Sequence, residues 1–263
     1  MNKPPSVLQA INIATKVRVE AEKDDINGII YAAQFILTNL TNSQKKMVTL
    51  DEKVARQTVL NFVQHLLKHD QFEAAATILW GAGVYDWRPQ SAADTWRCLF
   101  ENDKLLVQGA GAMGKTFNAA AWFLLDWMRD PEYTCIKVVS LTEAHAQRNV
   151  FAAIKNFYRT ALVRPEYEGS EDLVKSIQAN DDDKNGIHLV AVPKGDSGTG
   201  TLRGFHPSPR QKPDPKWGQM SRTHVVLDEA EEVPAGVWEG LQNILSAADT
   251  KDSKGRIKIF GAS

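Results

Sequence analysis

The stretch KLLVQGAGAMGKTFNAAAWFLLDW, from Lys104 to Trp127, decides the fold that this sequence predicts. A short apolar run at its start, Leu105–Val107, predicts a buried strand. After Thr116 the apolar side chains recur at helical spacing, which predicts a helix with an inner face of Ala120, Phe123, Leu124, Trp127 and Met128. The glycines between these two elements therefore lie on a strand-to-helix turn.

This turn has the pattern Gly109-x-x-x-x-Gly114-Lys115-Thr116. The backbone N–H groups of such a turn, together with the positive end of the following helix, can surround a phosphate chain. Lys115 would then reach the β- and γ-phosphates, and the Thr116 hydroxyl would ligate Mg²⁺. The candidate phosphate-binding residues are Gly109, Ala110, Gly111, Ala112, Met113, Gly114, Lys115 and Thr116. The alternative is a glycine-rich turn that ends in an exposed lysine.

A second group of candidate residues follows the apolar run Val225–Leu227, which predicts another buried strand. Asp228 comes directly after this run, at the carboxyl end of the strand, where ligands bind in open α/β sheets. We expect Asp228 to hold the Mg²⁺ of a nucleotide through water. Glu229 is the candidate general base, which takes a proton from the attacking water.

The remainder of this region alternates between strand and helix patterns. Strands are predicted over Cys135–Leu141, Ile187–Val192 and Arg256–Ser263, and helices from about Ala144 to Leu162 and from Ala235 to about Ala247. This alternation predicts an α/β fold with a mostly parallel central sheet flanked by helices. The acidic segment from Glu166 to Asp183 is interpreted as a solvated loop.

The first part of the chain is predicted to be a helical appendage. Amphipathic patterns run from Asp24 to Leu40, from after Thr49 to Leu67, and from about Gln71 to Trp80, where Gly81 follows. Their apolar stripes are interpreted as packing faces, with docking of a partner as the alternative. We therefore expect a helical region over residues 1–84 and a nucleotide-binding domain over residues 85–263.

Pro89 can open a further helix just before the glycine-rich turn, with Ala93, Trp96 and Leu99 on its apolar face. The amide of Gln90 can hydrogen-bond an adenine edge in both directions, because it carries both a donor and an acceptor. An ordinary first turn of a helix explains these residues equally well.

A long proline-rich segment from Lys194 to Ser221 precedes the Val225–Leu227 strand. No other region is as basic: Arg203, Arg210, Lys212, Lys216 and Arg222 lie in it or at its end. Such a loop could contact DNA phosphates or a neighbouring subunit. A surface loop without a partner is the alternative.

Composition describes an ordinary globular protein. Of the 263 residues, 43% are hydrophobic and 24% charged, and the net charge is −1. These values exclude a disordered or fibrous chain and a broadly basic nucleic-acid-binding face. We expect neither a secretion signal nor a membrane span, because no apolar stretch has the required length. A cytoplasmic location follows from this expectation.

Taken in order, these motifs resemble one family closely. Gln90, the Lys115 turn, GTLRGFHP at Gly200–Pro207, VVLDEAEEVP at Val225–Pro234 and the final IFGAS are similar to the ATPase domain of tailed-phage terminase large subunits. The resemblance covers roughly Tyr85 to Ser263. It implies a P-loop NTPase fold of the ASCE, RecA-like kind, with ATP and Mg²⁺ bound, in a motor that packages viral DNA.

The resemblance also implies roles and partners. Gln90 would contact adenine, Asp228 the metal, Glu229 the water, and Gly261 to Ser263 would couple hydrolysis to movement, with Ser263 near the nucleotide. The partners would be double-stranded DNA held by weak backbone contacts, a portal on the procapsid, the small terminase subunit and further copies in a pentameric ring. The setting would be the cytoplasm of an infected bacterium.

Two departures from the family pattern matter. Many terminases carry an arginine inside the phosphate loop, whereas residues 110–113 supply none, so Arg203 or, second, Arg148 is expected to act from a neighbouring subunit. The nuclease domain of the family is absent from this sequence, so we expect a truncated chain without nuclease activity. The alternatives are a helicase-like or DNA-remodelling ATPase and a nucleotide switch that does not hydrolyse ATP.

Overall fold

The computed structural model describes residues 50–84, 89–108, 114–142, 144, 148–165, 175–178, 185–192, 222–248 and 256–262. The chain divides into two compact units, Met1–Tyr85 with Ala161–Arg164, and Asp86–Thr160 with Pro165–Ser263. The helix predicted over Asp24–Leu40 and the proline-rich segment from Lys194 to Ser221 lie outside the described residues.

The described part of the first unit contains two helices, α3 (Leu50–Lys68) and α4 (Phe72–Val84). The pattern that predicted α3 is confirmed, with Val63 and Leu67 fully buried. The interruption predicted at Gly81 is confirmed, because this residue is non-helical, at φ 64° and ψ 180°, and a short helical segment follows it to Val84. Only glycine tolerates this backbone conformation, so Gly81 ends the regular helix that begins at Phe72 and kinks the chain before that segment.

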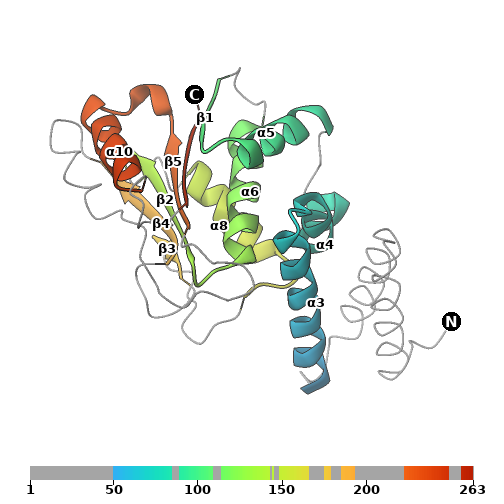
Figure 1. Cartoon of the computed structure of the whole chain (residues 1–263). Helices are drawn as coiled ribbons and strands as arrows, with labels where there is room; N and C mark the ends of the chain where they lie inside the picture. Colours follow the sequence, from blue (N-terminus) through green and yellow to red (C-terminus); the bar gives the residue numbers. More distant parts are fainter. Residues whose placement is uncertain are drawn as a thin grey trace. The chain divides into compact units, whose positions relative to one another are not determined.

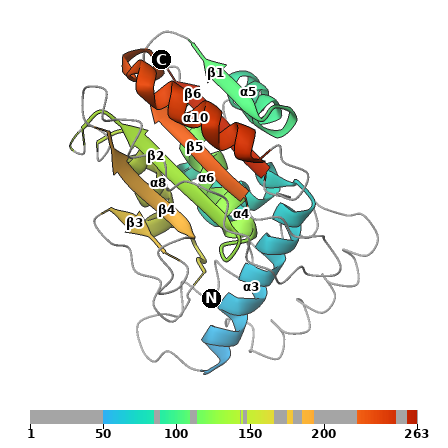
Figure 2. The ribbon, with the colours of Figure 1, turned by 60° about the vertical axis from the view of Figure 1, so that its left-hand side comes forward.

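In the second unit, the described residues form one six-stranded sheet. The arrangement of its strands can be followed in Figures 1 and 2. The strands are β1 (Lys104–Val107), β2 (Thr134–Ser140), β3 (Ser176–Ile177), β4 (Gly186–Ala191), β5 (Arg222–Asp228) and β6 (Arg256–Ala262). Their order across the sheet is β1-β6-β5-β2-β4-β3, and every neighbouring pair is parallel except β3 with β4. The expected α/β fold with a mostly parallel sheet is therefore confirmed.

Helices cover both faces of this sheet. The helices α5 (Pro89–Glu101), α6 (Lys115–Arg129) and α8 (Val150–Thr160) lie on one face, and α10 (Ala235–Ala248) lies on the other (Figure 2). The connection from β1 to β2 runs away from the β1 edge, whereas the connection from β5 to β6 runs back towards it. Right-handed crossovers in opposite directions must place their helices on opposite faces.

Three expectations from the sequence need correction. Leu105–Val107 does not form a buried strand: β1 is the edge strand of the described sheet, and Leu106 is 55% exposed. Ser176 and Ile177, inside the segment interpreted as a solvated loop, are buried and pair with β4. On α5, Trp96 and Leu99 are buried as expected, but Ala93, one turn nearer the start of the helix, is exposed.

Helix α6 is the centre of the second unit. Every residue from Asn118 to Met128 is buried, not only the apolar stripe that the sequence predicted. On its side of the sheet the Phe123 ring contacts the rings of His224 and Phe260, with centroids 5.6 Å and 5.7 Å away. The opposite face of β5 presents Val225 and Leu227 to a separate apolar cluster with α10.

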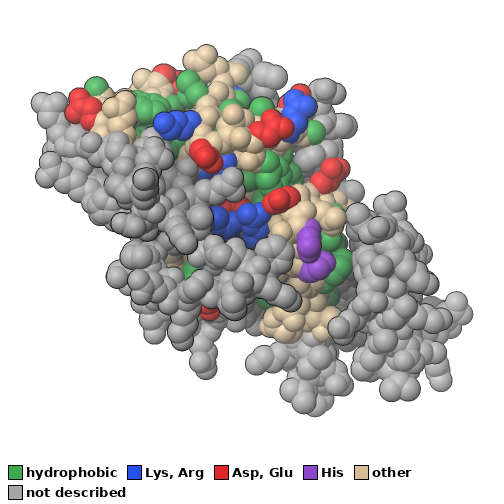
Figure 3. Space-filling view, in the orientation of Figure 1, with side chains coloured by type: hydrophobic (Ala, Val, Ile, Leu, Met, Phe, Trp, Pro, Cys, Tyr) green, Lys and Arg blue, Asp and Glu red, His purple; other side chains and the backbone are tan. Residues whose placement is uncertain are grey.

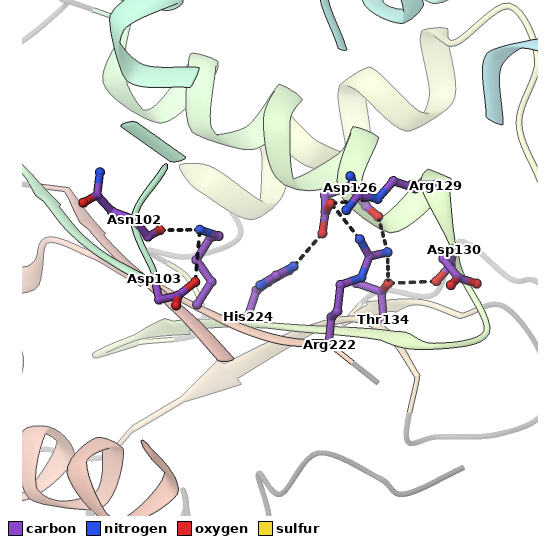
Figure 4. Close-up of polar contacts among 9 residues, drawn as sticks. Asn102, Asp103, Asp126, Arg129, Asp130, Thr134, Arg222 and His224 are labelled. Atoms are coloured by element: carbon purple, nitrogen blue, oxygen red, sulfur yellow. Dashed lines mark hydrogen bonds and ion pairs between the residues drawn. The ribbon is translucent and has the colours of Figure 1, made fainter. Parts of the chain in front are cut away.

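A buried polar cluster joins α6 to the start of β5 (Figure 4). The Asp126 carboxylate accepts hydrogen bonds from Arg222 at 3.0 Å and from His224 Nε2 at 2.6 Å. Arg222 also donates to the Asp126 carbonyl at 3.2 Å and to the Thr134 hydroxyl on β2 at 2.8 Å. We call Asp126, Thr134, Arg222 and His224 the basal cluster, because they lie at the amino end of β5. Removing one partner of such a buried ion pair typically costs about 3–5 kcal/mol.

Lys258 of β6 makes a second polar contact at the same end of the sheet. Its ammonium donates to the Asn102 carbonyl, lies 3.7 Å from the Asp103 carboxylate and is 5.7 Å from the centre of the Trp122 ring. The next residue, Ile259, bonds to the same turn: the Ile259 N–H donates to the Asp103 carbonyl at 2.7 Å. The turn before β1 is thereby attached to β6.

The charges of the basal cluster are coupled. Burial alone would raise the pKa of Asp126, but Arg222, His224 and Arg129 together hold it far below its usual value. Burial lowers the pKa of His224, and the Asp126 carboxylate opposes this shift only in part. His224 is therefore neutral near pH 7 and donates its Nε2 proton to Asp126.

We predict that acid weakens the fold in two stages. Because the folded pKa of His224 lies below its unfolded value near 6.5, the unfolded chain binds more protons and stability falls as the pH drops through about 6.5. The lowered pKa of Asp126 adds a further loss below about pH 4. Denaturant unfolding at several pH values measures this effect: between pH 7.5 and 5.5 the unfolding free energy of His224→Gln should fall less than that of the wild type. If the unfolding free energy of both proteins fell equally over this range, the loss would belong to other groups, such as His65, whose pKa is also lowered.

Candidate functional site

The candidate site lies at the carboxyl edge of the sheet, where three strands end at the same level. Val107 of β1 is in register with Ala262 of β6, and Ala262 is in register with Asp228 of β5. Because neighbouring strands lie 4.7–4.9 Å apart, the ends of β1 and β5 are separated by about 10 Å. The backbone thus brings together the two segments that the sequence analysis singled out.

Helix α6 begins at this edge. Gly114 is its N-cap residue in the left-handed conformation, with φ 76°, and its carbonyl accepts the Asn118 N–H at 2.8 Å. As a glycine, the N-cap residue provides no side-chain cap of its own. The first N–H groups of α6 are therefore suited to bind an anion, and Lys115 is the first residue of the helix. Residues 109–113, expected to bind phosphate with them, lie outside the described residues.

Helix α5 is attached to this first turn. The Trp96 indole N–H donates to the Asn118 carbonyl at 2.9 Å. Gln90, the candidate adenine contact, is the second residue of α5, but its side chain is not among those described. Sequence reasoning missed the Trp96–Asn118 bond, because Trp96 was interpreted only as part of the apolar face of the helix.

Glu229 follows β5 in a strained backbone conformation. It is half-buried and has φ 54° and ψ 61°, and its carbonyl accepts the Glu232 N–H at 2.9 Å at the start of the short helix η1 (Ala230–Glu232). The left-handed region costs about 1–2 kcal/mol for a residue with a Cβ atom. Asp70 is the other described non-glycine residue with positive φ, and aspartate tolerates this region better. Strain at a glutamate is a feature of functional sites.

We predict that Glu229→Gly stabilises the fold while it removes the carboxylate. Release of the backbone strain should raise the unfolding free energy by about 0.5–1 kcal/mol, as measured by denaturant titration. Asp70→Gly is the matched control, and its unfolding free energy should rise less, because aspartate tolerates the left-handed region better than glutamate does. A destabilised Glu229→Gly would show that contacts of the side chain outweigh the strain.

Gly261 lets the three strand ends approach one another. A Cβ atom at this position would lie 2.9 Å from Leu106 Cδ1 on β1 and 2.9 Å from Ala230 Cβ, directly after Glu229. The leucine side chain can rotate, but the alanine Cβ is fixed to the backbone. Gly261 therefore sets how closely the turn that carries Glu229 lies against β6.

We predict that Gly261→Ala displaces the turn at Glu229. Overpacking against Ala230 should cost about 1–3 kcal/mol of unfolding free energy. The double variant Gly261→Ala, Ala230→Gly should recover part of this loss, whereas Gly261→Ala, Leu106→Ala should not. Equal recovery in both double variants would contradict this reasoning.

The remaining predicted site residues are placed only in part. Thr116 is half-buried in the first turn of α6, and Arg148 is exposed in the turn before α8. Asp228 ends β5, but its side chain lies outside those described. Arg203 and Ser263 lie outside the described residues. The second unit therefore brings Lys115, Thr116 and Glu229 to one sheet edge.

Charge on the described surface is mixed. On the face that Figure 3 shows, acidic and basic side chains are interspersed. The contact with DNA expected from the basic loop depends on Arg203 and its neighbours, whose placement the structure does not describe. Among the described helices, none is both long and apolar enough to cross a membrane.

Comparison of the chain with models of protein families and with curated proteins gives no match.

Proposed function

We propose that this chain binds ATP with Mg²⁺ at the carboxyl edge of the sheet and hydrolyses it. The observation that carries the proposal is the strained Glu229. It directly follows Asp228, which is in register through Ala262 with Val107, on the strand that leads to Lys115. The connections that leave β1 and β5 run in opposite directions, and in α/β sheets ligands bind outside the carboxyl ends at such a point.

The residue types at this edge are the ones that a nucleoside triphosphate with Mg²⁺ would need. The first turn of α6 and Lys115 would hold the phosphates, and Thr116 and Asp228 would hold Mg²⁺. The metal would neutralise charge on the phosphate oxygens. Glu229 would orient the attacking water and accept its proton. The adenine would lie towards Gln90 at the start of α5.

The motor role is the finer part of the proposal. It is supported by the order of motifs shared with terminase large subunits, in which ATP hydrolysis drives DNA into a procapsid. Arg203, or else Arg148, would supply the transition-state cation from a neighbouring subunit in the ring. The DNA, the portal and the small terminase subunit would be its partners in the bacterial cytoplasm.

We predict that Lys115 and Glu229 separate ATP binding from turnover. Lys115→Ala should weaken ATP binding, because it removes the charge that reaches the β- and γ-phosphates. Glu229→Gln should bind ATP with near wild-type affinity and lose about 100-fold or more in turnover, because the amide cannot accept the proton. Nucleotide titration and phosphate release, with and without Mg²⁺, measure these two effects.

Glu231→Gln is the matched control, since Glu231 is an exposed neighbour on η1. Turnover unchanged in Glu229→Gln would overturn the mechanism. Tight ATP binding without turnover, even with DNA and capsid supplied, would favour the nucleotide switch. A second RecA-like domain encoded after Ser263 would favour a helicase-like motor, and a nuclease-like domain would favour packaging.

A further inference from the structure

We propose that the basal cluster is a positioning device for the candidate site, which fixes how far α6 extends along β5. This inference rests on the proposed function. The Asp126 carboxylate receives Arg222 and His224 from β5, and Arg222 extends to Thr134 on β2 (Figure 4). Three elements are thereby joined at one point by directional bonds. Apolar packing alone does not prevent a helix from sliding, whereas these bonds have fixed lengths.

The two elements that leave this point end at the same edge of the sheet. Asp126 lies eleven positions after Lys115 on α6, a rise of about 16 Å. Asp228 lies four positions after His224 on β5, a rise of about 13 Å. The basal cluster therefore forms the common base of two arms of similar length. One arm ends at Lys115 and the other at Asp228 and Glu229.

Helix α6 can transmit a shift at its base to its start. All its residues from Asn118 to Met128 are buried, so neighbours on every side hold the helix as one body. Its Asp126 carboxylate is also 3.5 Å from Arg129 Nε on the next turn. A displacement where Asp126 meets Arg222 would therefore appear at Lys115.

Such a displacement would affect turnover more than binding. Lys115 and the first N–H groups of α6 would move with the helix, so a nucleotide bound to them would move as well. Glu229 stays on β5 and would lose its alignment with the water at the γ-phosphate. Misplacement of reacting groups by 1 Å can cost about 100-fold in rate. The cluster thus acts through Lys115 and Glu229 and does not touch the nucleotide itself.

The test uses the whole chain and two cluster variants. Arg222→Met removes the bonds to Asp126 and Thr134. The triple variant Asp126→Leu, Arg222→Met, His224→Phe replaces the ionic groups with apolar side chains, which often restores stability. For each variant, ATP affinity, turnover per nucleotide-binding molecule and melting temperature are measured. Ile187→Val, at a fully buried position of β4, is the destabilised control away from β5.

We expect turnover per binding-competent molecule to fall at least about ten-fold in both cluster variants, with ATP affinity changed less than about three-fold. The control Ile187→Val should have a lower melting temperature than the wild type and an unchanged turnover. Recovery of both stability and turnover in the triple variant would overturn the proposal, because the cluster would then serve stability alone. A wild-type chain that binds no ATP would refute the proposed function instead. If Arg222→Met fails to fold, the triple variant decides.

Discussion

The insertion of β6 between β1 and β5 is the constraint on which the candidate site depends. Through this strand Val107 and Asp228 reach the same level although 121 positions of the sequence separate them. β6 can occupy this place because Gly261 has no side chain where Leu106 and Ala230 approach it. A bulky residue there would push the Glu229 turn away from β6. Backbone packing at Gly261 therefore contributes to the separation of the two candidate segments.

The two ends of the second unit have different chemistry. At the amino end of β5, buried charges have partners: Asp126 pairs with Arg222 and accepts a hydrogen bond from neutral His224, and, on the neighbouring strand, Lys258 bonds to the turn at Asn102. At the carboxyl end, β5 leads into a strained turn, and α6 starts at a glycine N-cap. The buried ion pairs and the candidate site therefore lie at opposite ends of the sheet. The ion pairs stabilise the scaffold without occupying the groups that are suited to bind a ligand.

The sequence correctly predicted the elements that a local residue pattern determines. Clear strand or helix patterns were confirmed to within a few residues for residues 134–140, 222–228 and 115–129. The exposure of β1 was missed because a short apolar run is the same in a central and an edge strand. The basal cluster joins residues 96 positions apart, which no local pattern reveals. The conformation of Glu229 was equally hidden, since glutamate is not a residue of left-handed turns. For the site, the sequence indicated its residue types and the end of the strand, but not Gly261 or Trp96 as supports.

The burial of α6 on all sides limits where this chain can accept change. A substitution that changes the size of any side chain from Asn118 to Met128 alters the packing of the interior. Tolerated substitutions and sites for chemical labelling are therefore expected on other elements. Helix α10 offers the contrast, because Val237 and Leu241 face the sheet while Trp238, Glu239 and Gln242 are exposed. A fluorophore, a crosslinker or an affinity tag is therefore best attached to the outer side of α10, where it reports on the molecule without entering its interior.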